Sequence, residues 1–237
     1  MSGLRIAIVT TACGVLAAMS WAQTRSTASL LSKVDHLVYA APDVSAAIEK
    51  LERLLGIRAT PGGQHPGRGT RNALIALSPV AYLEIIGPDP EQPKPEFPRW
   101  FGIDALSESR LVTWAVKGSN LGPFAEQAAR RGVTLGTVAP GSRQRPDGVL
   151  LRWQYTDPRV VVADGIVPFF IDWGATPHPA ASAASGASLV DLRAEHPEPT
   201  RVQGALHQLG LDLQVEKGSK ASLTATIVTP RGRIELR

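Results

Sequence analysis

The chain has 237 residues, a hydrophobic fraction of 43% and a formal net charge of +4 at pH 7. This length and composition fit a globular protein with one sizeable core or two small ones, and they exclude disorder throughout the chain. The positive excess is small and its residues are scattered, which argues against nucleic acid as a partner and favours a solvated surface of mixed charge.

The first residues differ from the rest of the chain. Arg5 precedes an apolar run over residues 6–18. The small residues Ser20 and Ala22 stand three and one positions before a possible cleavage point, where a signal peptidase requires small side chains. This pattern predicts a secretory signal peptide over residues 1–22. The alternative is an uncleaved anchor, but the run is shorter than the roughly twenty residues that a membrane-spanning helix needs. We therefore expect a secreted or periplasmic protein with no stable membrane anchor after cleavage. The single cysteine lies in this segment, so the mature chain would have no disulfide and no thiolate ligand.

Beyond this segment, one order of elements recurs three times: an apolar strand, a polar turn, an amphipathic helix that ends at a glycine, and further strands. In the first copy, a strand over residues 34–40 precedes a helix with Asp43 as its N-cap and Gly56 at its end. The corresponding strand and helix lie at 111–116 and 120–132 in the second copy, and at 189–193 and 200–210 in the third. Glycine ends each helix because it adopts the left-handed conformation at low cost. The recurrence indicates an internal repeat.

Three strand-like runs follow the helix in each copy. They are 57–60, 72–77 and 81–86 in the first, 133–135, 149–155 and 167–173 in the second, and 211–215, 221–228 and 233–236 in the third. The segments 88–98 and 177–186 are rich in proline or in alanine and serine, which is typical of linkers. The sequence therefore predicts two full modules over residues 34–174 and a third partial module over residues 187–237.

The fold class follows from what one module leaves uncovered. A sheet with a helix on one face keeps its other apolar face open, so one module cannot close a core alone. We expect an α+β protein in which repeated β-α-β-β-β modules pair into an open cup-shaped sheet, with a ligand on the concave side and the third module at an edge.

Three ionisable side chains interrupt apolar strand faces. Counting every second residue, His36 shares a face with aliphatic neighbours, Glu84 lies with Tyr82, and Asp172 lies with Phe170. A buried carboxylate needs a partner, a proton or a metal. The ordinary alternative is that Glu84 pairs with an arginine, His36 bonds a backbone carbonyl and Asp172 lies in water at a strand end.

Three blocks of the sequence resemble glyoxalase-like domain proteins of the vicinal oxygen chelate superfamily: residues 34–39 (VDHLVY), 65–74 (HPGRGTRNAL) and 82–86 (YLEII). The resemblance implies a divalent metal held by the first and last strands of each module. It would place His36, Glu84 and Asp172 as ligands of Zn, Mn, Mg or Fe, with their side chains converging on the concave surface. The fourth position falls on Thr113, which is not a strong ligand.

Substrate contacts are predicted from cations, an amide and aromatic rings near these strands. Arg71 and Arg152 could bind a carboxylate in a two-pronged fashion, and Asn72 stands at the start of a strand. Trp114 is a further candidate, together with Trp153 and Trp173, although tryptophans on strands are more often core residues. The alternative for residues 65–72 is a solvated hairpin connection.

Two functional hypotheses remain. The first is a metal-assisted lyase- or isomerase-type enzyme acting on a small carbonyl- or carboxylate-bearing substrate, in which Glu84 or Asp172 moves a proton. The second is a metal-free protein of the same fold that binds or sequesters a small molecule. Glyoxalase activity is disfavoured by the missing fourth ligand, and extradiol ring cleavage by the missing second histidine on the strands that would supply the metal ligands. The oligomeric state stays open.

Overall fold

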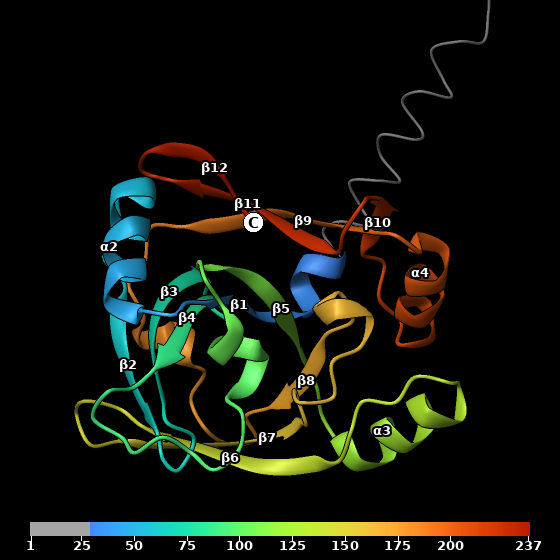
Figure 1. The fold of residues 1–237 in the computed structure, drawn as a ribbon, viewed down its shortest axis with the longest axis horizontal. Helices are drawn as coiled ribbons and strands as arrows, with labels where there is room; N and C mark the ends of the chain where they lie inside the picture. Colours follow the sequence, from blue (N-terminus) through green and yellow to red (C-terminus); the bar gives the residue numbers. More distant parts are fainter. Residues whose placement is uncertain (1–28) are drawn as a thin grey trace, which may run out of the picture.

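The computed structural model describes residues 29–237, so the predicted signal peptide, residues 1–22, lies outside the described part. The protein is α+β, as predicted: an eight-stranded barrel packs beside a smaller four-stranded sheet (Figure 1). No helix in the described range has both the length and the apolar character needed to cross a bilayer.

The first half of the barrel begins with the predicted strand, helix and glycine. Its elements are β1 (Val34–Ala40), α2 (Val44–Leu55), β2 (Thr60–His65), β3 (Thr70–Ser78) and β4 (Ala81–Pro88). The Asp43 carboxylate accepts hydrogen bonds from the backbone N–H groups of Ser45 and Ala46, which caps α2, and Gly56 ends the helix at φ 73°.

The second half repeats this order. Its elements are η1 (Trp100–Ala105), β5 (Arg110–Lys117), α3 (Leu121–Arg130), β6 (Val138–Gln144), β7 (Leu150–Thr156), η2 (Ala163–Gly165) and β8 (Phe169–Asp172). Within each half the order across the sheet is the same: β1-β4-β3-β2 and β5-β8-β7-β6. The antiparallel pairing of β1 with β5 joins the halves on one side.

On the other side the sheet closes instead of staying an open cup. The closing contact pairs β2 with β6 at Gln64 and Gln144. Closure removes the two sheet edges that the open form would expose. The predicted concave surface thus becomes the inside of a barrel.

The third module forms the separate sheet, in the order β10-β9-β11-β12. After η3 (Pro179–Ser182) in the linker, its elements are β9 (Ser188–His196), α4 (Pro199–Gln208), β10 (Gln214–Lys217), β11 (Ser222–Thr229) and β12 (Gly232–Leu236). The sheet lies across one side of the barrel (Figure 1), and its buried residues belong to the same apolar cluster as the outer face of the barrel strands.

One set of predicted strands is displaced. The residues directly after each helix-ending glycine were predicted as strands, but β2, β6 and β10 begin three or more residues later than predicted. Ile57, Leu135 and Leu211 in these connections are buried in the main cluster. Their burial produced the apolar pattern, whereas a strand also needs a neighbouring strand to share its hydrogen bonds.

The two faces of the barrel strands have different environments. Leu37, Leu83 and Phe170 belong to the large cluster outside the barrel, among the helices and the second sheet. The residues next to them in sequence, His36, Glu84 and Phe169, line a cavity inside the barrel. This alternation is the period of two that strands impose, and it places the site inside the barrel.

Candidate functional site

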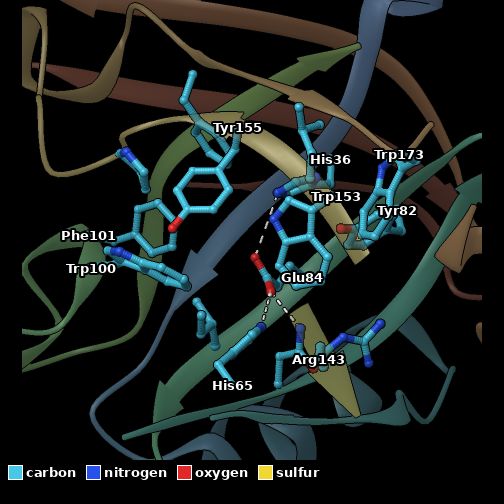
Figure 2. Close-up of a pocket in the computed structure, with 15 residues that line it drawn as sticks. His36, His65, Tyr82, Glu84, Trp100, Phe101, Arg143, Trp153, Tyr155 and Trp173 are labelled. Carbon is cyan, nitrogen blue, oxygen red and sulfur yellow. Dashed lines mark hydrogen bonds and ion pairs between the residues drawn. The ribbon is translucent and has the colours of Figure 1, made fainter. Parts of the chain in front are cut away.

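A cavity lies inside the barrel, and its wall combines polar groups with aromatic rings (Figure 2). It is lined by His36, His65, Asn72, Tyr82, Glu84, Ile86, Trp100, Phe101, Arg143, Trp153, Tyr155, Pro158, Phe169, Ile171 and Trp173. The space that a water-sized molecule can reach among these side chains is about 40 Å³. Since one water needs roughly 10–15 Å³ by this measure, the cavity holds a ligand of only a few heavy atoms, or one end of a larger ligand.

Glu84 is the only carboxylate among the described residues that line the cavity. Its side chain comes from β4, and the residue is 6% exposed. The Asn72 amide donates a hydrogen bond of 2.6 Å from Nδ2 to Glu84 Oε1. The Nε2 atoms of His36 and His65 lie 3.8 Å and 4.0 Å from the two carboxylate oxygens, beyond hydrogen-bonding distance (Figure 2).

A buried carboxylate behind the cavity wall orients His36. Asp35 Oδ1 lies 2.7 Å from His36 Nδ1, and the other oxygen, Oδ2, lies 3.2 Å from His178 Nε2. The indole N–H of Trp173 donates to the same carboxylate at 3.1 Å. Burial raises the pKa of Asp35, but the hydrogen bonds to His178 and His36 outweigh it and lower the pKa to about 2. Asp35 is therefore ionised at neutral pH and requires a proton on His36 Nδ1.

This orientation leaves Glu84 and His36 facing each other across the cavity. When His36 is neutral with its proton on Nδ1, its Nε2 presents a lone pair to a carboxylate oxygen 3.8 Å away. Two buried acceptors at this separation are stable only with a proton on one of them or with a donor beside them that reaches both. The arrangement is thus suited to holding and moving a proton.

His65 contributes a neutral ring to the opposite side of Glu84. Burial lowers the pKa of His65 to about 4, although the nearby Glu84 carboxylate raises it. The ring is fixed by a contact of 3.0 Å between Nδ1 and the Thr70 hydroxyl. At neutral pH, His65 can therefore offer a hydrogen bond but no positive charge.

Arg143 supplies the positive charge of the cavity wall. It projects from β6, is buried, and donates a hydrogen bond to the Gly62 carbonyl. Burial lowers the pKa of the guanidinium, while Tyr82 and Glu84 oppose this effect. The group stays charged at neutral pH because an arginine pKa starts above 12. A Cβ at Gly62 would overlap both Asn72 Oδ1 and the Arg143 guanidinium, so these two side chains occupy the space that glycine leaves.

The structure brings three of the predicted site residues together: His36, Glu84 and Asn72 line one cavity. Asp172 does not join them. It lies on β8 next to Ile171, which faces the cavity, so its side chain projects from the opposite face and accepts a hydrogen bond from the backbone of Gly174. Counting by two correctly grouped Asp172 with Phe170, but that shared face packs towards α3 and not into the barrel.

Three of the predicted substrate contacts, Trp114, Arg71 and Arg152, also lie outside the cavity lining. Trp114 is fully buried in the main core and donates from its indole to the Ile166 carbonyl at 2.8 Å. Arg71 donates to the Ser45 hydroxyl at the start of α2, and Arg152 is exposed on β7. Their predicted role in binding substrate has no support from these positions. Trp153 and Trp173, in contrast, do line the cavity (Figure 2).

The predicted metal ligands do not fit a shared ion in this arrangement. Asp172 is turned away, and the β8 residues that face the cavity, Phe169 and Ile171, are apolar. Thr113, at the fourth position, lines a different hollow. In residues 29–237, no three His, Cys, Asp or Glu side chains are grouped as a metal site would require.

The residues of the site that were not predicted include Asp35, His65 and Arg143. Asp35 stands where the pairing of β1 with β5 shifts register between Val34 and His36, and such a bulge re-aims a side chain that alternation would turn away. His65 lay within a block of residues interpreted as a loop. Asp35 and His65 each had a signal in the sequence: Asp35 is a charged residue within an apolar run, and His65 is an imidazole within a glycine-rich run.

Comparisons with known proteins agree with this fold. The model of the glyoxalase-like domain family matches residues 34–210. A hypothetical protein from Staphylococcus aureus is 12% identical, with 86% of this chain and 84% of that chain covered and a TM-score of 0.55, which supports the fold alone. None of the curated proteins matches the chain.

Methylmalonyl-CoA epimerases are also similar, with lower TM-scores. The enzyme from Mycobacterium tuberculosis is 19% identical over 61% of this chain and 90% of its own, with a TM-score of 0.39. A variant of the Streptomyces coelicolor enzyme, in complex with 2-nitronate-propionyl-CoA, is 18% identical over 62% of this chain and 98% of its own, with a TM-score of 0.42. Since the family model spans more than half of the sequence, the chain belongs to the glyoxalase-like domain family.

Proposed function

We propose that the barrel cavity is the active site of a lyase- or isomerase-type enzyme, in which Glu84 moves a proton at a carbon next to a carbonyl or carboxylate group. The observation that carries this proposal is the state of Glu84: a carboxylate that is 6% exposed, is held by one amide N–H, and faces two imidazole nitrogens without bonding either. A carboxylate in such a water-poor pocket is suited to act as a general base or acid.

The residues around Glu84 have separate roles in this proposal. Asn72 fixes the carboxylate, so that its second oxygen stays directed into the cavity. A substrate atom that lies beside this pair can contact both groups at about 3 Å, because the facing atoms of Glu84 and His36 are 3.8 Å apart. The proton taken by Glu84 can be returned to carbon directly, or it can pass through His36 to another atom of the substrate. In the second route the Asp35 carboxylate would stabilise the imidazolium while His36 holds the proton.

The rest of the wall limits the substrate. Arg143 is the only arginine among the described lining residues, and a guanidinium binds a carboxylate in a two-pronged fashion. The surrounding aromatic rings exclude water, which strengthens these charge interactions. With about 40 Å³ of free space, the reacting part of the substrate must be small. The proposal contains no metal step, because Asp172, one of the three predicted ligands, lies outside the cavity that His36 and Glu84 share.

We also propose that the protein is exported from the cytoplasm. The apolar segment with Ser20 and Ala22 supports export, so the enzyme would meet its substrate outside the cytoplasm. The mass of the mature protein tests this point, since cleavage after residue 22 removes a defined segment. An intact amino terminus on protein recovered from the cytosol would contradict it.

Deuterium exchange tests the proposed chemistry without knowledge of the natural substrate. Pyruvate and 2-oxobutanoate serve as probes, because each has an acidic C–H next to a carbonyl and a carboxylate for Arg143. We expect wild-type protein in D2O to accelerate exchange at that carbon, as seen by NMR, and Glu84→Gln to slow it by roughly 10²–10⁴-fold.

Asp172→Asn is the matched control, since it makes the same chemical change outside the cavity, and it should exchange at the wild-type rate. Equal exchange by Glu84→Gln and wild type would refute the role of Glu84. Binding of the probes with no exchange by the wild type would favour the second hypothesis, a protein that sequesters a small molecule.

A further inference from the structure

We propose that a second hollow beside the cavity binds an uncharged, apolar tail of the substrate. This inference rests on the proposed function, because it extends the molecule whose reacting end lies at Glu84. The hollow, here called the side chamber, has a volume of about 260 Å³. Its lining residues are Phe101, Gly102, Arg110, Val112, Thr113, Pro158, Val160, Val161, Asp164, Gly165, Val167 and Phe169.

The side chamber adjoins the cavity directly. Phe101, Pro158 and Phe169 line both spaces, so the two hollows meet at these three residues. The free volume is about 40 Å³ in the cavity and about 260 Å³ in the side chamber. A substrate longer than a few atoms therefore needs a second space, and this one begins at the cavity wall.

The lining selects for an apolar group. The charged residues of the side chamber are Arg110 and Asp164, which have opposite signs, so its lining has no net charge to attract an ion. Asp164 is already bonded to His196 at 3.2 Å. Val160 and Val161 are 40% and 61% exposed, and they belong to the few large apolar side chains that the described surface shows to water. Covering such side chains with an apolar ligand is favourable.

The backbone on both sides of the side chamber is held in an uncommon shape. Phe101 and Gly102 have φ angles of 60° and 64°, and Ala163 and Asp164 have φ angles of 48° and 53°. Residues other than glycine rarely adopt these left-handed angles, and where they persist the surrounding structure holds them. The backbone on two sides of the side chamber is therefore held in a fixed conformation by the residues around it.

A chain-length series tests the side chamber by binding alone. The probes are straight-chain 2-oxo acids from pyruvate to 2-oxooctanoate, and titration calorimetry gives the dissociation constant of each. We expect the affinity for wild-type protein to rise about fourfold for each methylene that enters the side chamber.

Val160→Asp places a charge in the lining and should abolish this rise. Val228→Asp is the matched control, because Val228 is 43% exposed on β11, away from both hollows, and it should keep the rise.

Two results would refute the proposal that the side chamber binds the substrate tail. One is equal affinity for all chain lengths, and the other is a rise in affinity with chain length that Val160→Asp retains. In that case, deuterium exchange at the C–H of pyruvate that Glu84→Gln slows would still support the proposed function. Conversely, a rise that Val160→Asp abolishes, together with exchange that Glu84→Gln leaves unchanged, would refute the proposed function and keep the side chamber as a ligand site.

Discussion

Replacing Asp35 with asparagine tests how the site is held together. Asp35 is 1% exposed and accepts hydrogen bonds from His36, His178 and Trp173 at 2.7, 3.2 and 3.1 Å. Asparagine keeps the shape of the side chain but removes its charge. It also turns one acceptor into an N–H donor that faces donors, so at least one of these hydrogen bonds is lost.

The size of the effect follows from the pKa of Asp35, which the fold lowers from 3.8 to about 2. One pKa unit corresponds to about 1.4 kcal/mol, so the ionised carboxylate stabilises the folded state by about 2 kcal/mol relative to a neutral group. Because the pKa is lower in the folded state, this contribution is present at pH values above the unfolded pKa of 3.8. It is lost as the pH falls from about 4 to about 2.

Urea unfolding of wild type and Asp35→Asn measures this difference. We expect the variant to be less stable by about 2 kcal/mol near pH 7, and the gap to narrow towards about pH 3 as the wild-type carboxylate takes up its proton. Asp172→Asn, which alters a half-exposed carboxylate at a strand end, serves as the control and should change little. A gap that is absent near neutral pH, or that stays constant on acidification, would refute the assigned role of Asp35.

Three further changes test other parts of the structure. Gly62→Ala should reduce exchange activity strongly, because the added methyl group displaces Asn72, and a crystal structure of the variant should show that amide moved from Glu84. Trp114→Phe should lower the free energy of unfolding by about 1–3 kcal/mol, since the buried Ile166 carbonyl loses its donor, and the activity of the folded variant should match wild type. Asp172→Ala should leave unchanged the metal content of protein purified without chelators or a metal-affinity tag; a lower metal content would return Asp172 to the site.

Much of the fold could be predicted because its signals are local. The helix between Asp43 and Gly56 has a capping side chain, an apolar stripe and a glycine, all readable within fifteen residues or so. The strands that follow the glycines were misplaced because burial of Ile57 and Leu211 imitates a strand. Only the pairing partners, which come from distant parts of the chain, decide where hydrogen bonding begins.

The candidate site could be predicted only in part, for a related reason. His36 and Glu84 stood out because each is an ionisable group on an otherwise apolar strand, and both lie in the cavity. Alternation groups residues on one face but does not say which face turns inward, so Asp172 was assigned to the wrong side of β8. The partners of Asp35 include His178, from the linker after the barrel, and no pattern in the sequence joins these two positions.

The exchange of the C–H protons of 2-oxobutanoate in D2O, compared between wild type and Glu84→Gln, measures most directly whether Glu84 moves a proton. We expect exchange by the wild type and a loss of roughly 10²–10⁴-fold in the variant, with Asp172→Asn unaffected. Exchange that persists in Glu84→Gln at the wild-type rate would contradict the assignment of the barrel cavity as a proton-transfer site.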